Sequence, residues 1–466
     1  MRRTTILLLT SMLVASCGGG GDAPGPGSPG GNVSGVCGTQ SQKQFVLDRA
    51  REWYLFVNTL PTTVQLSQYS SADDLLDALT ATARAQNRDR FFSYLTSIAD
   101  EQRFFTAGES VGFGIGTIIR DSNTRLFITQ VFENSAAASA GFARGDEVLA
   151  LGTSSSTLEQ MSTLLARPNG FSDAVGPAEA GITRVFRVRT LSGTTVERSV
   201  TKRSYSLNPV PANRLIARSG LSPLGYVQLR TFVSTADAQL RSAFATLRAN
   251  NVRDVVLDLR YNGGGLVATA ELLSDLLADG KAGQLQYRTR LNPAKSSEQI
   301  DVAFRNRAEA IPALRIAFLT TGSSASASEL VINSLAPYAD VAIIGAPTFG
   351  KPVGQFAFDL ASSCDLRLRL VTFQNLNRDG TGDYFGGLPD ANYNDTFCAA
   401  SDDLTRPQDD SAEAMTATAI AWLNDGVCPV SATATPLVSK PLRDELGLPA
   451  MPAKPSFEQR LLPGTY

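Results

Sequence analysis

The sequence of 466 residues contains no histidine, and it has only five methionines, five cysteines and two tryptophans. A hydrolase built on a Ser-His-Asp triad is therefore excluded. A zinc site is not indicated either, because histidine and Cys-x-x-Cys pairs are both missing. A charge excess is missing too: 42 basic and 44 acidic residues give a formal net charge of -2, which offers no electrostatic footprint for nucleic acid. The 43% of hydrophobic residues is typical of a globular protein.

The first 37 residues differ in kind from the rest. Arg2 and Arg3 precede an apolar stretch at residues 6–14 that is too short to span a bilayer, which predicts a secretory signal. The sequence LVASC at residues 13–17 resembles a bacterial lipobox, so we expect Cys17 to be lipidated; the alternative is a plain signal peptide. Gly18 after the cysteine favours outer-membrane sorting by the same resemblance. The Gly- and Pro-rich residues that follow predict a flexible tether.

Four cysteines remain after Cys17, an even number in an exported protein, which predicts two disulfides with three possible connectivities. The alternative is four buried free thiols. We favour one bond that closes a single loop and one that ties the two ends of the folded region: Cys364–Cys398 and Cys37–Cys428.

A small helical domain and a β-rich module are expected before residue 206. Apolar residues at helical spacing from Val46 to Val57, and a second helix that starts at Ser71, predict the helical part. Short alternating runs separated by turns predict the β-rich part. That part resembles a PDZ domain, with VGFGIG at residues 111–116 in the place of the carboxylate-binding loop and residues 134–150 as its helix, turn and strand. The alternative is a β-domain whose glycines only make turns. As a PDZ domain, it would bind a peptide as an added strand through Gly112, Phe113, Gly114 and Ile115.

From about residue 220 onward, strand and helix patterns alternate, which predicts an α/β architecture with parallel strands. Three Gly- or Ser-rich turns follow successive strands: YNGGG at 261–265, SSASASE at 323–329 and TFGK at 348–351. Right-handed crossovers bring the carboxyl ends of parallel strands to one edge of the sheet. The turns can therefore combine a nucleophile, a base and oxyanion donors in one site.

Ser326 is the candidate nucleophile and Lys351 the candidate base. Ser326 precedes a predicted helix whose free N–H groups favour developing negative charge, so the amide of Ala327 is a candidate oxyanion donor together with Gly264 or Gly265. Lys351 must be neutral to accept a proton, which requires burial, and Gln355 could orient its amine. Each residue alone has a simpler interpretation: SASE at 326–329 fits a helix capping box, and most lysines lie on the surface. The segment GAPTFGK at 345–351 also approaches a Walker A loop, but Pro352 stands at the Ser/Thr position.

Taken in order, five segments resemble the carboxyl-terminal processing, or tail-specific, protease family: GYVQL, LDLRYNGGGL, SASASEL, GAPTFGK and GLPD, at residues 225–229, 257–266, 324–330, 345–351 and 387–390. The resemblance implies a crotonase-like α/β protease core with a β-rich PDZ domain and a small N-terminal helical domain. It assigns Ser326 as nucleophile, Lys351 as base and Gln355 as its orienting residue. The oxyanion donors become the amides of Gly264 and Ala327, with Gly265 a near alternative. Two positions depart from the family: Pro352 replaces a glycine, and Tyr261-Asn-Gly-Gly-Gly replaces Asn-Asn-Pro-Gly-Gly.

The expected function is an exported serine endopeptidase that cleaves proteins recognised at their C-termini, without a metal or organic cofactor. The expected location is the outer membrane, facing the periplasm, through the anchor on Cys17. The alternative is a catalytically silent lipoprotein that binds peptides or envelope partners. The predicted parts are a signal peptide, a tether, a helical domain, a PDZ domain, a protease core and a tail, at residues 1–17, 18–37, 38–105, 106–205, 206–428 and 429–466.

Overall fold

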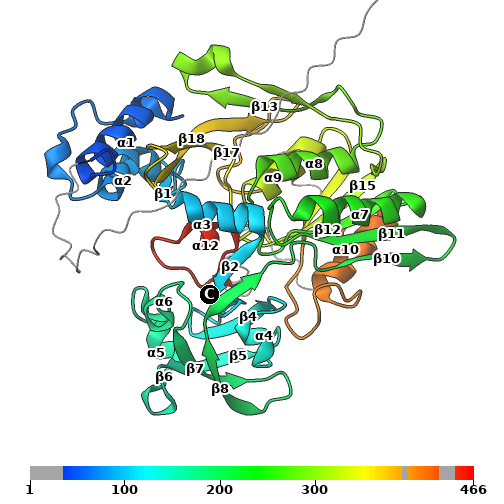
Figure 1. Ribbon diagram of the computed structural model, residues 1–466. Helices are drawn as coiled ribbons and strands as arrows, with labels where there is room; N and C mark the ends of the chain where they lie inside the picture. Colours follow the sequence, from blue (N-terminus) through cyan, green and yellow to red (C-terminus); the bar gives the residue numbers. More distant parts are fainter. Residues whose placement is uncertain (1–34, 391–396, 430–446) are drawn as a thin grey trace, which may run out of the picture.

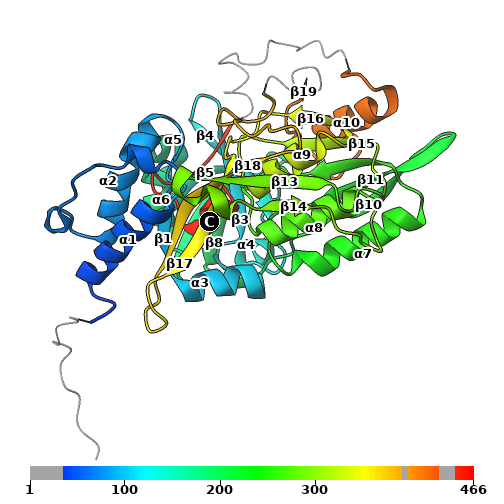
Figure 2. The same cartoon turned by 90° about the horizontal axis from the view of Figure 1, so that it is seen from above.

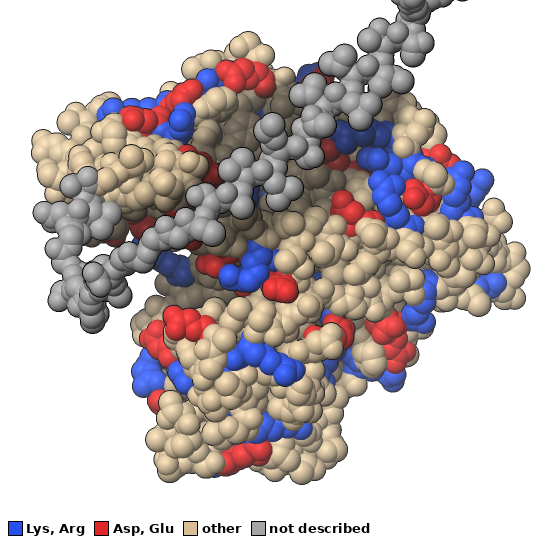
Figure 3. Space-filling model, in the orientation of Figure 1, with Lys and Arg blue, Asp and Glu red and all other residues tan. Residues whose placement is uncertain are grey.

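The computed structural model describes residues 35–390, 397–429 and 447–466. The predicted signal peptide, the lipidation of Cys17 and most of the predicted tether lie outside these residues. None of the described helices is both long and apolar enough to cross a membrane. On the face drawn in Figure 3, basic and acidic side chains are interspersed rather than gathered in a patch of one sign.

The N-terminal helices α1 (Thr39–Trp53) and α2 (Ala72–Ala85) pack against an antiparallel sheet (Figure 1). Ser71 caps α2, as expected, by accepting a hydrogen bond from the Asp74 amide at 3.1 Å. Apolar side chains of both helices share one buried cluster with Leu368 and Leu370. The helices therefore do not form a core of their own. The strands of this sheet are β1 (Tyr94–Thr96), β13 (Leu285–Leu291), β14 (Asp301–Ala303), β17 (Val353–Asp359) and β18 (Arg367–Leu376).

The β-rich module lies below the other parts in Figure 1. A two-stranded ribbon of β2 (Glu109–Gly112) and β9 (Arg203–Ser206) joins it to the rest of the chain. Its larger sheet has the order β20-β3-β4-β5-β7-β8, with β6 paired to β5. The strands of that sheet are β3 (Ile115–Arg120), β4 (Arg125–Val131), β5 (Glu147–Gly152), β6 (Glu159–Gln160), β7 (Thr183–Arg189), β8 (Thr195–Thr201) and β20 (Leu448–Pro449). The strand β20 comes from the C-terminal segment, some 250 residues after β8, so this module is not built from one continuous stretch.

A six-stranded sheet forms the centre of the molecule, in the order β10-β11-β12-β15-β16-β19. Only the β10–β11 pair is antiparallel. Every residue of β12 is buried, as in parallel strands covered on both faces. The strands are β10 (Asn213–Arg218), β11 (Leu221–Gln228), β12 (Asp254–Asp258), β15 (Arg315–Thr320), β16 (Asp340–Gly345) and β19 (Phe397–Ala399).

Helices cover both faces of this sheet (Figure 2). Leu240, Phe244 and Leu247 recur at helical spacing along α7 and bury one face of the sheet together with side chains of α8 and α9. Trp422 and Leu423 of α10 bury the opposite face. The predicted α/β core with its N-terminal helices is confirmed. The four helices are α7 (Ala236–Ala249), α8 (Val267–Leu277), α9 (Ala327–Leu335) and α10 (Ala414–Asp425).

All four cysteines after Cys17 form disulfides, but the favoured pairing is wrong. The bonds are Cys37–Cys364 and Cys398–Cys428, with Cα atoms 5.5 and 5.4 Å apart. Cys398 lies in β19 at the edge of the central sheet, and Cys428 follows α10, which packs on that same sheet. Cys364 lies in the turn between β17 and β18, next to the start of α1. The predicted Cys364–Cys398 pair and the observed Cys398–Cys428 pair are about equally close in sequence, so sequence separation could not choose between them; the packing of α10 on the central sheet decides which thiols meet.

We expect peptide mapping of the unreduced protein by mass spectrometry to find Cys37 linked to Cys364 and Cys398 linked to Cys428. The Cys398→Ala/Cys428→Ala double variant should lose about 2–4 kcal/mol of unfolding free energy in urea titrations, because the disulfide closes a loop of 30 residues in the unfolded chain. Reduced protein is the control for the mapping. Linkage of Cys364 to Cys398 would contradict the observed connectivity.

Candidate active site

Three turns after β12, β15 and β16 meet at one edge of the central sheet, as predicted. Parallel pairing of Leu257 with Phe318, and of Phe318 with Ile343, places the carboxyl ends of these strands side by side. The serine-rich turn is fastened directly to the glycine-rich one. The Ser324 hydroxyl donates to the Leu259 carbonyl at 2.7 Å, and the Ser328 hydroxyl donates to the Asn262 carbonyl at 2.9 Å.

Ser326 stands between these two anchored serines at the N-cap of α9. Its backbone has φ +57° and ψ -110°, a left-handed conformation that costs a residue with a side chain on the order of 1–3 kcal/mol. Its side chain is half-buried, whereas Ser324 and Ser328 are fully buried. Strain of this kind is concentrated at functional sites, where it aims a side chain. Ser326 is therefore the most exposed of these three serines.

Glu329 joins the turn of Ser326 to the turn of Lys351. Its carboxylate is fully buried, and Oε2 accepts hydrogen bonds from the amides of Ser326 and Lys351, both at 2.8 Å. Oε1 accepts from the Gly350 amide at 2.6 Å and from the Thr348 hydroxyl at 2.5 Å. Burial raises the pKa of Glu329, and these four donors oppose that rise. The sequence pattern identified only the capping bond to Ser326, so the bonds to the second turn are a role that sequence reasoning missed.

The Lys351 side chain has the properties that a base requires. Burial, together with the positive charge of Arg460, lowers its pKa to about 7. Its Nζ donates to Gln355 Oε1 at 3.1 Å, which is the contact that an orienting residue would make. The Gln355 amide in turn donates to the Phe92 carbonyl at 2.5 Å, and the Phe92 ring centroid lies 5.2 Å from Nζ.

No hydrogen bond joins Ser326 Oγ to Lys351 Nζ among the residues that the structure describes. The amine is instead engaged with Gln355. The two turns are nevertheless fixed relative to each other by the Glu329 carboxylate. Ser326 and Lys351 are thus neighbours without a direct hydrogen bond between their side chains; in enzymes, catalytic contacts often tighten only when substrate binds.

The predicted oxyanion donors lie next to the nucleophile. A Cβ placed on Gly264 would lie 2.9 Å from the Ala327 nitrogen and 2.9 Å from Ser326 Cβ. Gly264 has φ +108°, so both its conformation and this close approach exclude a side chain. Its amide donates to Asn262 Oδ1 at 2.9 Å, however, and is engaged in this state. Gly265 also has a positive φ, +141°, and pairs with Phe232. Ala327 opens α9, where the amide lacks an acceptor within the helix.

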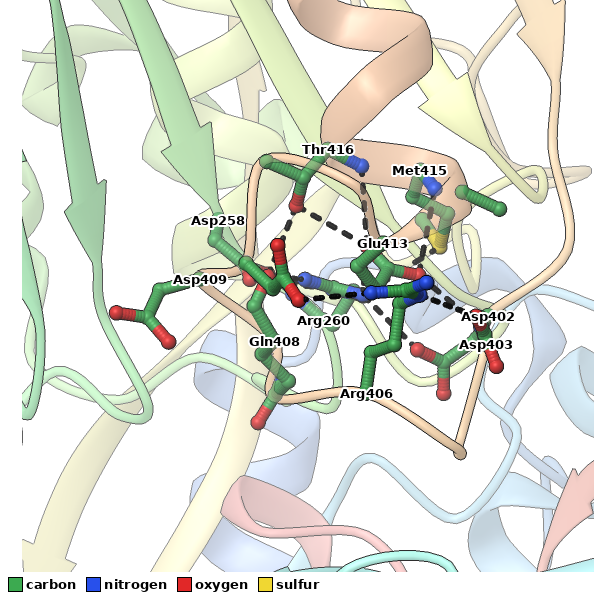
Figure 4. A network of polar contacts seen from close by, with 12 residues as sticks. Asp258, Arg260, Asp402, Asp403, Arg406, Gln408, Asp409, Glu413, Met415 and Thr416 are labelled. Atoms are coloured by element: carbon green, nitrogen blue, oxygen red, sulfur yellow. Dashed lines mark hydrogen bonds and ion pairs between the residues drawn. The ribbon is translucent and has the colours of Figure 1, made fainter. Parts of the chain in front are cut away.

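A fully buried ion cluster supports the glycine-rich loop (Figure 4). Arg260, whose side chain is 0% exposed, contacts the carboxylates of Asp258, Asp402 and Glu413 at 2.6, 2.9 and 3.0 Å. These carboxylates keep the pKa of Arg260 well above its usual value despite the burial. The next residue, Tyr261, has φ +64° and donates its hydroxyl to Asp402. The cluster thus fixes the backbone immediately before the predicted oxyanion loop.

Residues before the β-rich module also support the site, and the sequence carries no signal for them. Arg90 donates to the carbonyls of Phe349 and Gly350 at 2.7 and 2.5 Å. The buried Asp89 carboxylate accepts from the amides of Phe92 and Ser93 at 2.7 and 3.1 Å. Asp89 therefore fixes the carbonyl that receives the Gln355 hydrogen bond.

The residues predicted to bind a peptide lie at the start of β3 in the β-rich module. The amides of Gly114 and Ile115 donate to the main-chain oxygen of Tyr466 at 2.9 and 3.3 Å. A Cβ on Gly112 would lie 2.9 Å from the Tyr466 carbonyl carbon. The Phe113 side chain points instead into the core of the module, where its ring lies 5.1 Å from that of Phe186.

Comparison with known proteins agrees with this site. Residues 223–391 match the family described as peptidase family S41, and residues 41–94 match the N-terminal domain of that family. The carboxyl-terminal-processing protease of Synechocystis sp. is 26% identical over 272 residues, which are 58% of this chain and 59% of that protein. The chloroplastic carboxyl-terminal-processing peptidase 2 of Arabidopsis thaliana is 29% identical over 180 residues, 38% of this chain and 34% of that protein. The chain thus spans less than two thirds of each of these relatives.

A solved structure shares the fold. The crystal structure of a Bacteroides fragilis protein assigned to the S41 proteases superposes with a TM-score of 0.64 at 23% identity. The match covers 82% of this chain and 97% of that one. The arrangement of the N-terminal helices, the β-rich module and the central sheet is therefore shared over most of both chains.

Replacing the carboxylate that joins the two turns should destabilise the protein. Glu329→Gln points an amide NH₂ group at backbone donors, which leaves buried donors unpaired, so we expect a loss of about 1–3 kcal/mol in unfolding free energy in urea titrations. The exposed Glu179→Gln is the matched control, expected to stay within about 0.5 kcal/mol of the parent. Equal stability of both variants would contradict the role of Glu329.

Proposed function

We propose that this chain, which carries the peptidase family S41 domain at residues 223–391, is an exported serine endopeptidase of the carboxyl-terminal processing type. Its substrates are proteins or peptides with accessible C-termini. The observation that carries the proposal is the Glu329 carboxylate, which ties the backbone of Ser326 to that of the half-buried Lys351. The lowered pKa of Lys351, about 7, supports a neutral base near neutral pH.

In this proposal, Ser326 Oγ attacks the carbonyl carbon of the scissile peptide bond while Lys351 Nζ accepts its proton. The protonated lysine then gives the proton to the leaving amine, and the C–N bond breaks to leave an acyl-enzyme. Water, deprotonated by Lys351, attacks the ester and releases the new C-terminus. Gln355 keeps the Lys351 amine oriented throughout the reaction.

The tetrahedral intermediate needs donors at its oxyanion, and the amides of Gly264 and Ala327 are placed beside Ser326 for that purpose. Because the Gly264 amide donates to Asn262 Oδ1 in the resting site, it must exchange that acceptor for the oxyanion. Gly265 is the alternative donor. The left-handed backbone of Tyr261 and the Arg260 cluster limit how far this loop can move.

The β-rich module acts in this proposal as a PDZ domain that receives the substrate C-terminus. Its support is the glycine-containing turn at 112–115, whose amides donate to a main-chain oxygen, and the edge of β3, which already pairs with an extended segment of main chain at residues 464–466. A catalytically silent protein with the same β-rich module would bind peptides without turnover. The half-buried Lys351, whose pKa is lowered and which lines a cavity, favours the enzyme, because a lysine so perturbed in a cleft is typical of functional sites.

We also propose that the protein is exported and lipid-anchored on Cys17 in the outer membrane, facing the periplasm. The two disulfides support an oxidising compartment, since such bonds are rare in reducing ones. Metabolic labelling with an alkyne-bearing fatty acid, compared between the parent and Cys17→Ala, tests the anchor.

Loss of either side chain of the pair should abolish hydrolysis. For Ser326→Ala and Lys351→Ala we expect kcat to fall on the order of 10³-fold or more on an unfolded reporter protein, because removing a nucleophile or its base removes the covalent route. The exposed Ser297→Ala and the surface Lys281→Ala are controls that should retain activity. Activity that survives in Ser326→Ala, in protease-free material, would exclude the mechanism.

The pH dependence of kcat/KM should follow the deprotonation of Lys351. Below its pKa, Lys351 is protonated and cannot accept the Ser326 proton, so kcat/KM should rise with pH through an inflection near 7. Arg460→Gln removes a positive charge that lowers the pKa of Lys351, so the inflection should move to higher pH. Arg378→Gln, at an exposed position, is the control and should leave it in place. A profile that stays flat between pH 5 and 9 would argue against Lys351 as base.

A further inference from the structure

The C-terminal segment, residues 447–466, runs through both the β-rich module and the catalytic cleft. It enters as β20, which pairs antiparallel with β3, Leu448 opposite Ile119. It then forms α12 (Phe457–Leu461), which Figure 1 places between the module and the rest of the molecule. Phe457 and Leu461 pack there in a buried cluster with Phe104. The segment finally returns to the start of β3, and Figure 1 marks the end of the chain close to β2.

Residues 464–466 lie along the start of β3 as a bound peptide would. We call this place the groove: it is formed by residues 114–117 together with Phe171 and Ser172. They pair antiparallel with β3: Thr117 donates to the Gly464 carbonyl at 2.9 Å, and the Tyr466 amide donates to the Ile115 carbonyl at 3.0 Å. The Tyr466 oxygen receives the amides of Gly114 and Ile115. Strand addition with a main-chain oxygen held by consecutive amides is the mode by which such grooves capture peptides.

The Tyr466 side chain fills a matching pocket. It is 8% exposed, and its ring meets that of Phe171 edge to face at 4.9 Å. Its hydroxyl and that of Ser172 are hydrogen-bonded at 2.6 Å. An aromatic wall with a hydroxyl at its far end suits tyrosine better than an aliphatic or a charged residue, because both the ring and the hydroxyl are satisfied.

The same segment closes one side of the catalytic cleft. A cavity of about 240 Å³ lies between Lys351 and Ala325 on one side and Met451, Pro455 and Arg460 on the other. The Leu461 carbonyl accepts the Gly263 amide at 2.9 Å, within the predicted oxyanion loop. A substrate strand that enters this cleft therefore meets residues of the same segment that fills the groove.

We propose that residues 447–466 are an intramolecular ligand of the groove, and that the groove selects substrate chains that present tyrosine after small residues, as in Gly-Thr-Tyr. The proposal rests on the proposed function, because it names the substrate class of that site. A substrate must displace residues 464–466 to bind. Its apparent dissociation constant is therefore the intrinsic one divided by the fraction of molecules whose groove is vacant.

The test separates binding from catalysis by using full-length protein with Ser326→Ala. The probes are two fluorescein-labelled peptides, Arg-Leu-Leu-Pro-Gly-Thr-Tyr and the same peptide ending in lysine, followed by fluorescence anisotropy. The variants are Tyr466→Ala, which removes the side chain that fills the pocket, and Tyr466→Phe, which removes only the hydroxyl. Leu191→Ala, at a position 54% exposed on the module, is the matched control.

We expect the tyrosine probe to bind Tyr466→Ala at least about tenfold more tightly than the Tyr466 parent, and Tyr466→Phe to lie between them. Leu191→Ala should match the parent, and the lysine probe should bind Tyr466→Ala at least about tenfold more weakly than the tyrosine probe. Adding Phe171→Ala to Tyr466→Ala should remove the gain. Equal affinities of the parent, Tyr466→Ala and Tyr466→Phe, or equal affinities of the two probes, would overturn the proposal.

A second arm uses the chain with Ser326 intact and a reporter protein ending in Gly-Thr-Tyr. Tyr466→Ala should raise kcat/KM for this reporter several-fold over the parent, with no gain for a reporter ending in lysine. If the binding results hold but no variant hydrolyses either reporter, the peptidase proposal fails and the ligand proposal stands. If hydrolysis occurs without any dependence on Tyr466 or on the reporter end, the ligand proposal fails alone.

Discussion

The buried carboxylate of Glu329 is the interaction on which the site depends. A charge placed in the interior is costly unless several donors meet it, and here three backbone amides and one hydroxyl do so. Two of those amides belong to Ser326 and Lys351. Half of the donors that make the burial of Glu329 tolerable are thus backbone amides of the two residues that the proposed chemistry needs. The contacts that satisfy the buried Glu329 charge are therefore also the contacts that hold the two turns of the site together.

The ion cluster around Arg260 follows the same principle. Arg260 lies at the end of β12 with three carboxylates around it, two of them from the segment that leads into α10. Asp402 also contacts Arg144 of the β-rich module at 2.5 Å, and both arginines keep its pKa low although burial opposes this. The cluster therefore connects the central sheet, α10 and the module at the point where the glycine-rich loop begins. Removing one member would leave other charges buried without a partner.

The C-terminal segment makes groove and cleft depend on each other. Tyr466 fills the groove, and Arg460, six residues earlier, lowers the pKa of Lys351 through its charge. A change in the position of this segment would alter both the peptide-binding edge of β3 and the electrostatic environment of the base. Peptide binding and proton transfer would then be coupled through one covalent connection rather than through a path of side-chain contacts.

Local patterns predicted the strands, helices and turns of the α/β core, because periodic burial and glycine- or serine-rich turns are properties of neighbouring residues. They also predicted that the turns carrying Ser326, Lys351 and the glycines at 263–265 would lie together, since parallel strands end at one edge. Contacts between distant segments were not predictable in this way. Only tertiary packing brings together the residues of four such contacts. They are the disulfides of Cys364 and Cys398, the hydrogen bonds of Glu329 to the second turn, the hydrogen bonds of Asp89, and the pocket that holds Tyr466. The sequence determined by itself which side chains are available for chemistry, and the tertiary structure decided which of them meet, because a contact across hundreds of residues depends on how whole elements pack.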